Sequence, residues 1–171
     1  MFGKIAAGGL TIGGAYVAMS TGQPVTPQTF AVPATEAIGL LDAETRTVNG
    51  TGMGSLKLKS AGYDGGTVRI VVKRAGDKHR VECLVNVAAV AAAQSTATTD
   101  CTQPPGADRP MQAVGVKALN MVVGEHVAAT IERRTYDIDG VATGMMGLVV
   151  ANSATIATSV RRDLDETAAR P

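Results

Sequence analysis

The sequence has 171 residues, enough to bury one hydrophobic core, and contains no internal repeat of the kind that builds a solenoid. Its formal net charge is +1, so no strong field steers it toward nucleic acid. Aromatic residues make up 3% of the chain and none is tryptophan, which argues against stacking platforms for single strands or sugars. We therefore expect no nucleic-acid partner.

The N-terminus has the pattern of an export signal. A positive start, Met1–Lys4, precedes an apolar run over Ile5–Met19. We expect residues 1–20 to form a cleaved signal peptide or an uncleaved membrane anchor, with the domain outside the cytoplasm. The alternative is a cytosolic chain with an apolar N-terminus. Residues 21–32 are rich in Pro, Thr and Gln and predict an extended linker.

Residues 33–54 predict a short helix and an edge strand. Pro33 suits a first helical turn, and an apolar stripe supports a helix over Pro33–Glu44. Thr45–Val48 predicts a short edge strand. The glycine-rich segment Asn49–Gly54 leads into a strand instead of a helix N-terminus, so we do not interpret it as a phosphate-binding loop.

The centre of the chain predicts an antiparallel meander. Apolar residues alternate with polar ones in three runs, Ser55–Ala61, Thr67–Arg74 and His79–Val90. The connections Gly62–Gly66 and Ala75–Lys78 carry the Gly and Asp residues that tight turns need. We expect three strands, or four with the edge strand, that present one apolar and one basic face.

The basic face is the main candidate binding surface. The alternation places five cations on one side of neighbouring strands, with Glu82 as the only acid: Lys57, Lys59, Arg69, Lys73 and Arg80. One interpretation is an ordinary solvated face whose lysines discourage aggregation between sheet edges. The other is a docking face for phospholipid head groups of a membrane surface, or for an acidic envelope protein.

Two cysteines, Cys83 and Cys101, predict one disulfide if the chain is exported. Such a disulfide would link the predicted strand His79–Val90 to the segment Ala91–Pro110, which we predict to be a loop. Closing a loop of this length contributes about 3 kcal/mol in the chain-entropy model. In a cytosolic chain, both would instead be free thiols.

Beyond Pro110 the sequence predicts two helices. Apolar residues at three- and four-residue spacings indicate a helix over Pro110–Arg133, although Val127–Ile131 also fits a strand. A second helix begins with Asp137 or Asp139 as its N-cap and extends to about Asn152. It is apolar nearly all round, so we expect it to be buried, with a membrane span as the alternative. Residues 161–171 predict a flexible tail.

Residues with catalytic potential form no recognisable motif. An enzyme would need Glu125, His126, Asp137 and Asp139 to converge in a cleft. The spacings of the two histidines, His79 and His126, do not match a zinc site, and the sequence predicts no metal ion and no cofactor. We favour a protein without catalytic activity and keep an enzyme of unknown class as the further alternative.

The sequence as a whole predicts a single α+β domain over residues 33–160, with helices packed on the apolar face of the meander. We expect an exported, periplasmic or inner-membrane-anchored domain of bacterial type, with a binding or structural role. The alternative is a module that holds a small apolar ligand or lipid in a cleft between the sheet and helices bearing methionines. These are Met111, Met121, Met145 and Met146.

Overall fold

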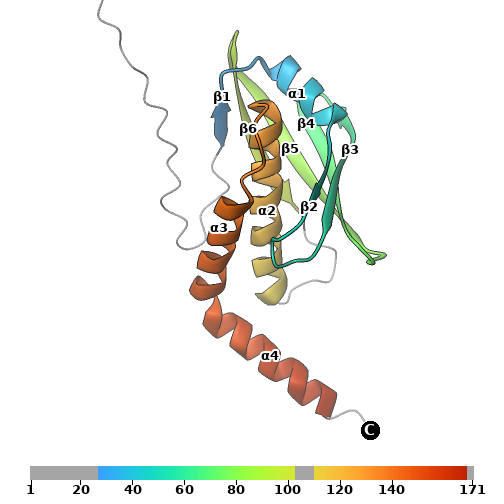
Figure 1. Cartoon of the computed structure of the whole chain (residues 1–171), viewed down its shortest axis with the longest axis vertical. Helices are drawn as coiled ribbons and strands as arrows, with labels where there is room; N and C mark the ends of the chain where they lie inside the picture. Colours follow the sequence, from blue (N-terminus) through green and yellow to red (C-terminus); the bar gives the residue numbers. More distant parts are fainter. Residues whose placement is uncertain (1–26, 103–109, 169–171) are drawn as a thin grey trace, which may run out of the picture.

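The computed structural model describes residues 27–102 and 110–168. Over these residues the protein is α+β, with a curled six-stranded antiparallel sheet and four helices (Figure 1). The α+β prediction is therefore confirmed, but the sheet is larger than the three or four strands expected. The elements are β1 (Gln28–Phe30), α1 (Ala34–Ala43), β2 (Thr45–Val48), β3 (Leu56–Asp64), β4 (Thr67–Arg74), β5 (Arg80–Ala91), β6 (Gln94–Cys101), α2 (Pro110–Ile131), α3 (Ile138–Ala151) and α4 (Ser153–Ala168).

The sheet has the strand order β1-β6-β5-β4-β3-β2, so that β2 to β6 form a continuous meander and β1 joins its far edge. The three central strands and the edge strand Thr45–Val48 confirm the predicted meander. The register pairs Leu58 with Val72 and Val72 with Val81. Because paired residues share a face, the apolar positions of neighbouring strands gather on one side.

Two strands lie where the sequence predicts irregular chain. β6 occupies part of the predicted loop, and β1 lies within the predicted linker. The inward positions of β6 are Ser95, Ala97, Thr99 and Cys101, all of them buried. Two of these four side chains are polar, so the strand lacks the apolar alternation that identifies β3 to β5.

Two helices cover the apolar face of the sheet. α1 contacts β3, β4, β5 and β6, and α2 contacts β6 and α1. The core joins the inward side chains of the strands to Leu41 of α1 and to Val122, Val123 and Val127 of α2. We expected both helices after Pro110 to lie on the sheet; α2 does, whereas α3 packs against α2, where Met121 meets the backbone of Gly144.

α2 runs as one helix through Gly124 to Ile131, so the alternative of a strand over Val127–Ile131 is wrong. The helix ends in a Schellman arrangement, in which the N–H of Arg134 donates to the carbonyl of Ala129 at 2.9 Å. The residue in the left-handed conformation is Arg133, with φ of 53°. Its side chain forms an ion pair with Glu36 of α1 at 2.9 Å, which a glycine there would not provide.

α3 begins as predicted, because the carboxylate of Asp137 accepts a hydrogen bond from the N–H of Gly140 at 2.9 Å. The expectation that this helix is buried is correct for Val141 and Met145 only. Met146, Val149 and Val150 are 72%, 53% and 74% exposed, since α3 contacts α2 but lies outside the layer that covers the sheet.

α4 follows α3 after a sharp bend and projects away from the sheet (Figure 1). It extends to Ala168, so the chain is helical over much of the predicted flexible tail. In the described part of the chain, no individual helix has the length and hydropathy to cross a bilayer; α3 and the first part of α4 meet that criterion only as a pair, bent by 69°. The predicted N-terminal signal or anchor lies outside the described residues.

Candidate functional site

All five cations of the predicted basic face are exposed on the side of the sheet opposite α1 and α2. The strand register places Lys57 directly opposite Lys73, and Lys73 directly opposite Arg80. A row of three positive charges therefore crosses β3, β4 and β5 at adjacent positions. Lys59 and Arg69 lie on the same face: Lys59 is two residues along β3 from Lys57, and Arg69 is four residues along β4 from Lys73.

The five cations of this basic face outnumber the acids beside them, which are two. Like charges at directly opposite positions of a sheet reduce its stability. Nevertheless, within residues 27–102 and 110–168 none of the five cations forms an ion pair. The acids beside them are Glu82, opposite Val71, and Asp100, opposite Leu84. Asp100 was missing from the sequence-based description because β6 was predicted to be a loop.

Cys83 and Cys101 form the predicted disulfide. They lie at directly opposite positions of β5 and β6, and both are buried beneath the helices. The bridge links two strands that already pair, in place of tying a loop to a strand. A disulfide of this kind accords with an oxidising compartment.

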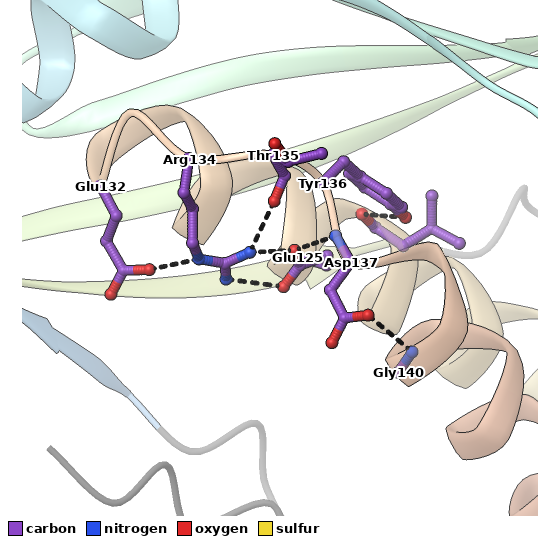
Figure 2. Close-up of polar contacts among 8 residues, drawn as sticks. Glu125, Glu132, Arg134, Thr135, Tyr136, Asp137 and Gly140 are labelled. Carbon is purple, nitrogen blue, oxygen red and sulfur yellow. Dashed lines mark hydrogen bonds and ion pairs between the residues drawn. The ribbon is translucent and has the colours of Figure 1, made fainter.

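A buried carboxylate at Glu125 organises the turn between α2 and α3 (Figure 2). Both of its oxygens accept hydrogen bonds from the guanidinium of Arg134, one of them at 2.9 Å. One oxygen also accepts the backbone N–H of Asp137 at 2.7 Å. The bonds to Glu125 raise the pKa of Arg134, which Glu132 holds from the other side at 2.6 Å. This network fixes the end of α2 to the beginning of α3.

His126, the next residue, is fully buried in the core. Neither of its ring nitrogens has a hydrogen-bond partner among the described residues. Burial, together with the nearby positive charge of Arg46, lowers the pKa of His126 to about 4. The imidazole is therefore neutral at physiological pH.

The four residues that an enzyme would need are divided among separate roles. Glu125 holds Arg134, His126 faces the core, Asp137 caps α3, and Asp139 is exposed in the first turn of that helix. None of the four lines either of two surface hollows of the described chain, one between α1, α2 and β2 and the other beside Pro33 and Ala89. The described residues also contain no group of three potential metal ligands.

The larger hollow is an open groove of about 670 Å³ between α1, the end of α2 and β2. No methionine lines it, and Met121 packs instead between α2 and α3. The groove thus lies away from the expected cleft between the methionine-bearing helices and the sheet. Sequence reasoning did not identify it, because Arg46 and Thr130, which line it, are far apart in the chain.

Comparisons with protein-family models, with curated proteins and with solved structures return no match. The functional argument therefore depends on the geometry of this chain.

Proposed function

We propose that this protein is an extracytoplasmic binding domain that docks on an anionic phospholipid surface through its basic face. The observation that carries the proposal is the row Lys57–Lys73–Arg80, three like charges at directly opposite positions with no ion-pair partner among the described residues. In isolation this arrangement costs stability. A layer of lipid phosphates would turn the same repulsion into attraction.

The expected strength of docking is modest. Near an anionic bilayer each Lys or Arg contributes about 1 kcal/mol, so five of them contribute at most about 5 kcal/mol, less the repulsion of Glu82 and Asp100 on the same face. This corresponds to a dissociation constant on the order of 0.1 mM, which gives transient contact. The N-terminal apolar segment, acting as the proposed tether, would raise the effective concentration of the domain at the surface and make the contact lasting. The role is structural or binding, without turnover.

The test measures binding of the full chain to vesicles. Vesicles of pure phosphatidylcholine report insertion of the apolar N-terminus, and vesicles that also contain phosphatidylglycerol add the electrostatic contribution. The triple variant K57Q/K73Q/R80Q removes the row. We expect it to lose about 100-fold of the additional affinity for phosphatidylglycerol vesicles, as three charges contribute about 3 kcal/mol.

A matched control is available on the helices. Lys117, Arg161 and Arg162 are also exposed, so K117Q/R161Q/R162Q changes the net charge equally without touching the sheet. Equal losses in both triple variants would show that only net charge matters and would reject the basic face. Tight binding to an acidic protein, with no preference for phosphatidylglycerol, would replace the lipid with a protein partner.

The proposed location has its own test, intact mass of protein from separated membrane and soluble fractions. Alkylation before and after reduction reports the Cys83–Cys101 bridge in the cell. We expect the bridge to be formed, and the chain to be either shortened by signal cleavage or full-length in the membrane fraction. Full-length protein in the soluble fraction with two free thiols would contradict export.

A further inference from the structure

The row Lys57–Lys73–Arg80 continues to the edge of the sheet with a hydroxyl group. Thr47 of β2 lies directly opposite Lys57 and is exposed, as the three cations are. Lysine, arginine and threonine side chains all donate hydrogen bonds. These four opposite positions on β2, β3, β4 and β5 include no carboxylate. An anion lying along the row therefore meets a donor on every strand.

The hydrogen bonds between β4 and β5 show how closely two of the cations approach each other. The N–H of Val87 donates to the carbonyl of Gly66 at 2.7 Å, so these two residues form a hydrogen-bonded pair. Along an antiparallel ladder such pairs alternate with pairs that share no hydrogen bond. Lys73 is an odd number of positions from Gly66, and Lys73 and Arg80 therefore form a pair without hydrogen bonds. In pairs of this kind the Cα atoms are about 4.5 Å apart and the side chains are close.

The other two cations of the row are spaced more widely. Between β3 and β4 the N–H of Ala75 donates to the carbonyl of Ser55 at 2.9 Å. Lys57 and Lys73 form the next hydrogen-bonded pair along that ladder, with Cα atoms about 5.5 Å apart. The row thus has a first gap between Lys57 and Lys73 and a second gap between Lys73 and Arg80. The centres of the two gaps are about 5 Å apart.

Two gaps favour two phosphates over one. A single lipid phosphate would lie between two cations and leave the third without a counter-charge. Two phosphates, one in each gap, would separate all neighbouring like charges. A short covalent link between the phosphates keeps the second at a high effective concentration once the first has bound. Glycerol supplies such a link, because phosphates on its two outer carbons are joined by a short flexible chain that reaches both gaps.

We propose that the row binds both phosphates of one diphosphatidylglycerol head group, in which two phosphatidyl groups share a single glycerol. Lys73 contacts both phosphates because it borders both gaps. Lys57, with Thr47 beside it, completes the first gap, and Arg80 completes the second. The inference rests on the lipid docking proposed above and names the lipid that the basic face prefers.

Water-soluble probes test the two-phosphate geometry without a membrane. Glycerol 1,3-bisphosphate, hexane-1,6-diol bisphosphate and glycerol 1-phosphate are titrated separately into the full chain labelled with ¹⁵N, and the backbone amide signals of Lys57, Lys73 and Arg80 are followed. We expect glycerol 1,3-bisphosphate to bind about tenfold more tightly than glycerol 1-phosphate, and about threefold more tightly than the longer bisphosphate of the same charge. Equal affinity of the two bisphosphates would show that charge alone decides and would overturn the proposal.

The variant K73Q removes the cation that borders both gaps. Lys73 is exposed and lies between like charges, so the fold should be retained. We expect K73Q to bind glycerol 1,3-bisphosphate about tenfold more weakly than the original chain. K117Q, at an exposed lysine of α2, changes the net charge equally and should bind it like the original chain. R80Q leaves only the first gap and gives a second reading. Equal losses in K73Q and K117Q would contradict the assigned contacts.

Vesicles distinguish failure of this inference from failure of lipid docking. Diphosphatidylglycerol replaces phosphatidylglycerol at equal phosphate content, so that the surface charge is the same. We expect the original chain to bind the diphosphatidylglycerol vesicles about tenfold more tightly, and K73Q to show no preference. Equal binding of the original chain to both lipids would overturn this inference and leave docking intact. Binding to neither vesicle would reject docking and, with it, a lipid head group as the source of the two phosphates.

Discussion

Glu125 and His126 are consecutive residues of α2, and their side chains are almost equally buried, at 3% and 0% exposure. Glu125 is nevertheless held by a bidentate guanidinium and a backbone N–H, whereas neither nitrogen of His126 has a partner among the described residues. The two side chains leave the helix about 100° apart, one toward the turn that precedes α3 and the other toward the core. Burial of Glu125 thus holds two helices together, whereas burial of His126 leaves two polar nitrogens unsatisfied and lowers stability.

The difference determines how each residue affects stability. The hydrogen bonds to the buried carboxylate of Glu125 replace those that water would make in the unfolded chain. Burial, with a smaller effect from the charge of Arg46, lowers the pKa of His126, so the partnerless imidazole stays neutral in the folded protein. Four predictions test this contrast.

Removal of the anchor should have the largest effect. Glu125→Ala removes the acceptor of two hydrogen bonds from the guanidinium of Arg134 and of one from the N–H of Asp137, and it breaks the link between α2 and α3. Breaking a buried ion pair costs about 3–5 kcal/mol, and we expect the lower end because Arg134 is partly exposed. Urea denaturation measures the loss. Glu132→Ala removes an exposed acid from the same arginine and should cost less than about 1 kcal/mol; equal losses would show that Glu125 has no special role.

Acid pH should lower the stability of the protein because His126 is buried in its neutral form. The pKa is about 4 in the folded protein and 6.5 for the unperturbed group, so between these values the unfolded chain binds more protons. The free energy of unfolding therefore keeps its full value, as far as His126 is concerned, above pH 6.5, and it decreases as the pH falls toward 4. Between pH 7.5 and pH 4.5 we expect a loss of about 2.5 kcal/mol from this residue. Denaturation of the original chain and of His126→Met at both pH values isolates it; parallel pH profiles would reject the low pKa.

The cap of α3 should have an intermediate effect. Asp137 donates its backbone N–H to Glu125 and uses its side chain to accept from Gly140, so Asp137→Ala removes the cap and leaves the anchor. We expect a loss of about 1 kcal/mol in thermal or urea denaturation. Asp139→Ala, in the same first turn, should cost about 0.3–0.5 kcal/mol through the helix dipole alone. The reverse order would mean that Asp137 does not act as the cap.

Replacement of His126 at neutral pH should have the smallest effect. His126→Met exchanges a partnerless imidazole for a flexible apolar side chain of similar size, which removes two unsatisfied nitrogens. We expect a change in the free energy of unfolding of less than about 1 kcal/mol at pH 7.5. A loss as large as that of Glu125→Ala would indicate that His126 forms an essential polar contact after all.

The sequence was sufficient where a local pattern matched the structure. In β3, β4 and β5 the alternation of Leu58, Ile70 and Val85 with charged residues identifies both faces, and the basic face follows from it. The helix cap at Asp137 could also be predicted, because an Asp just before an apolar helical segment is a common N-cap. The disulfide was predicted from cysteine number and expected compartment, not from strand pairing.

Features that depend on distant contacts could not be predicted. β6 buries Ser95 and Thr99, and only its pairing with β5 explains why polar side chains are acceptable there. Glu125 stood in an apolar part of α2, which was a signal that a partner exists. Its bond to the backbone of Asp137, however, depends on how the chain turns after Ile131. The groove required α1, α2 and β2 to meet, which no local pattern specifies.

The position of β1 has a consequence for the order in which the domain is assembled. β1 is the first strand of the described residues, yet its partner is β6, with Thr29 opposite Thr96. During synthesis Phe30 must therefore wait until β6 has emerged, and the long separation places this pairing among the slow, non-local steps of folding. A chain truncated before Gln94 has no partner for β1. Because Phe30 lies opposite Ser95, protection of the Phe30 amide from hydrogen exchange would thus report that the sheet is complete.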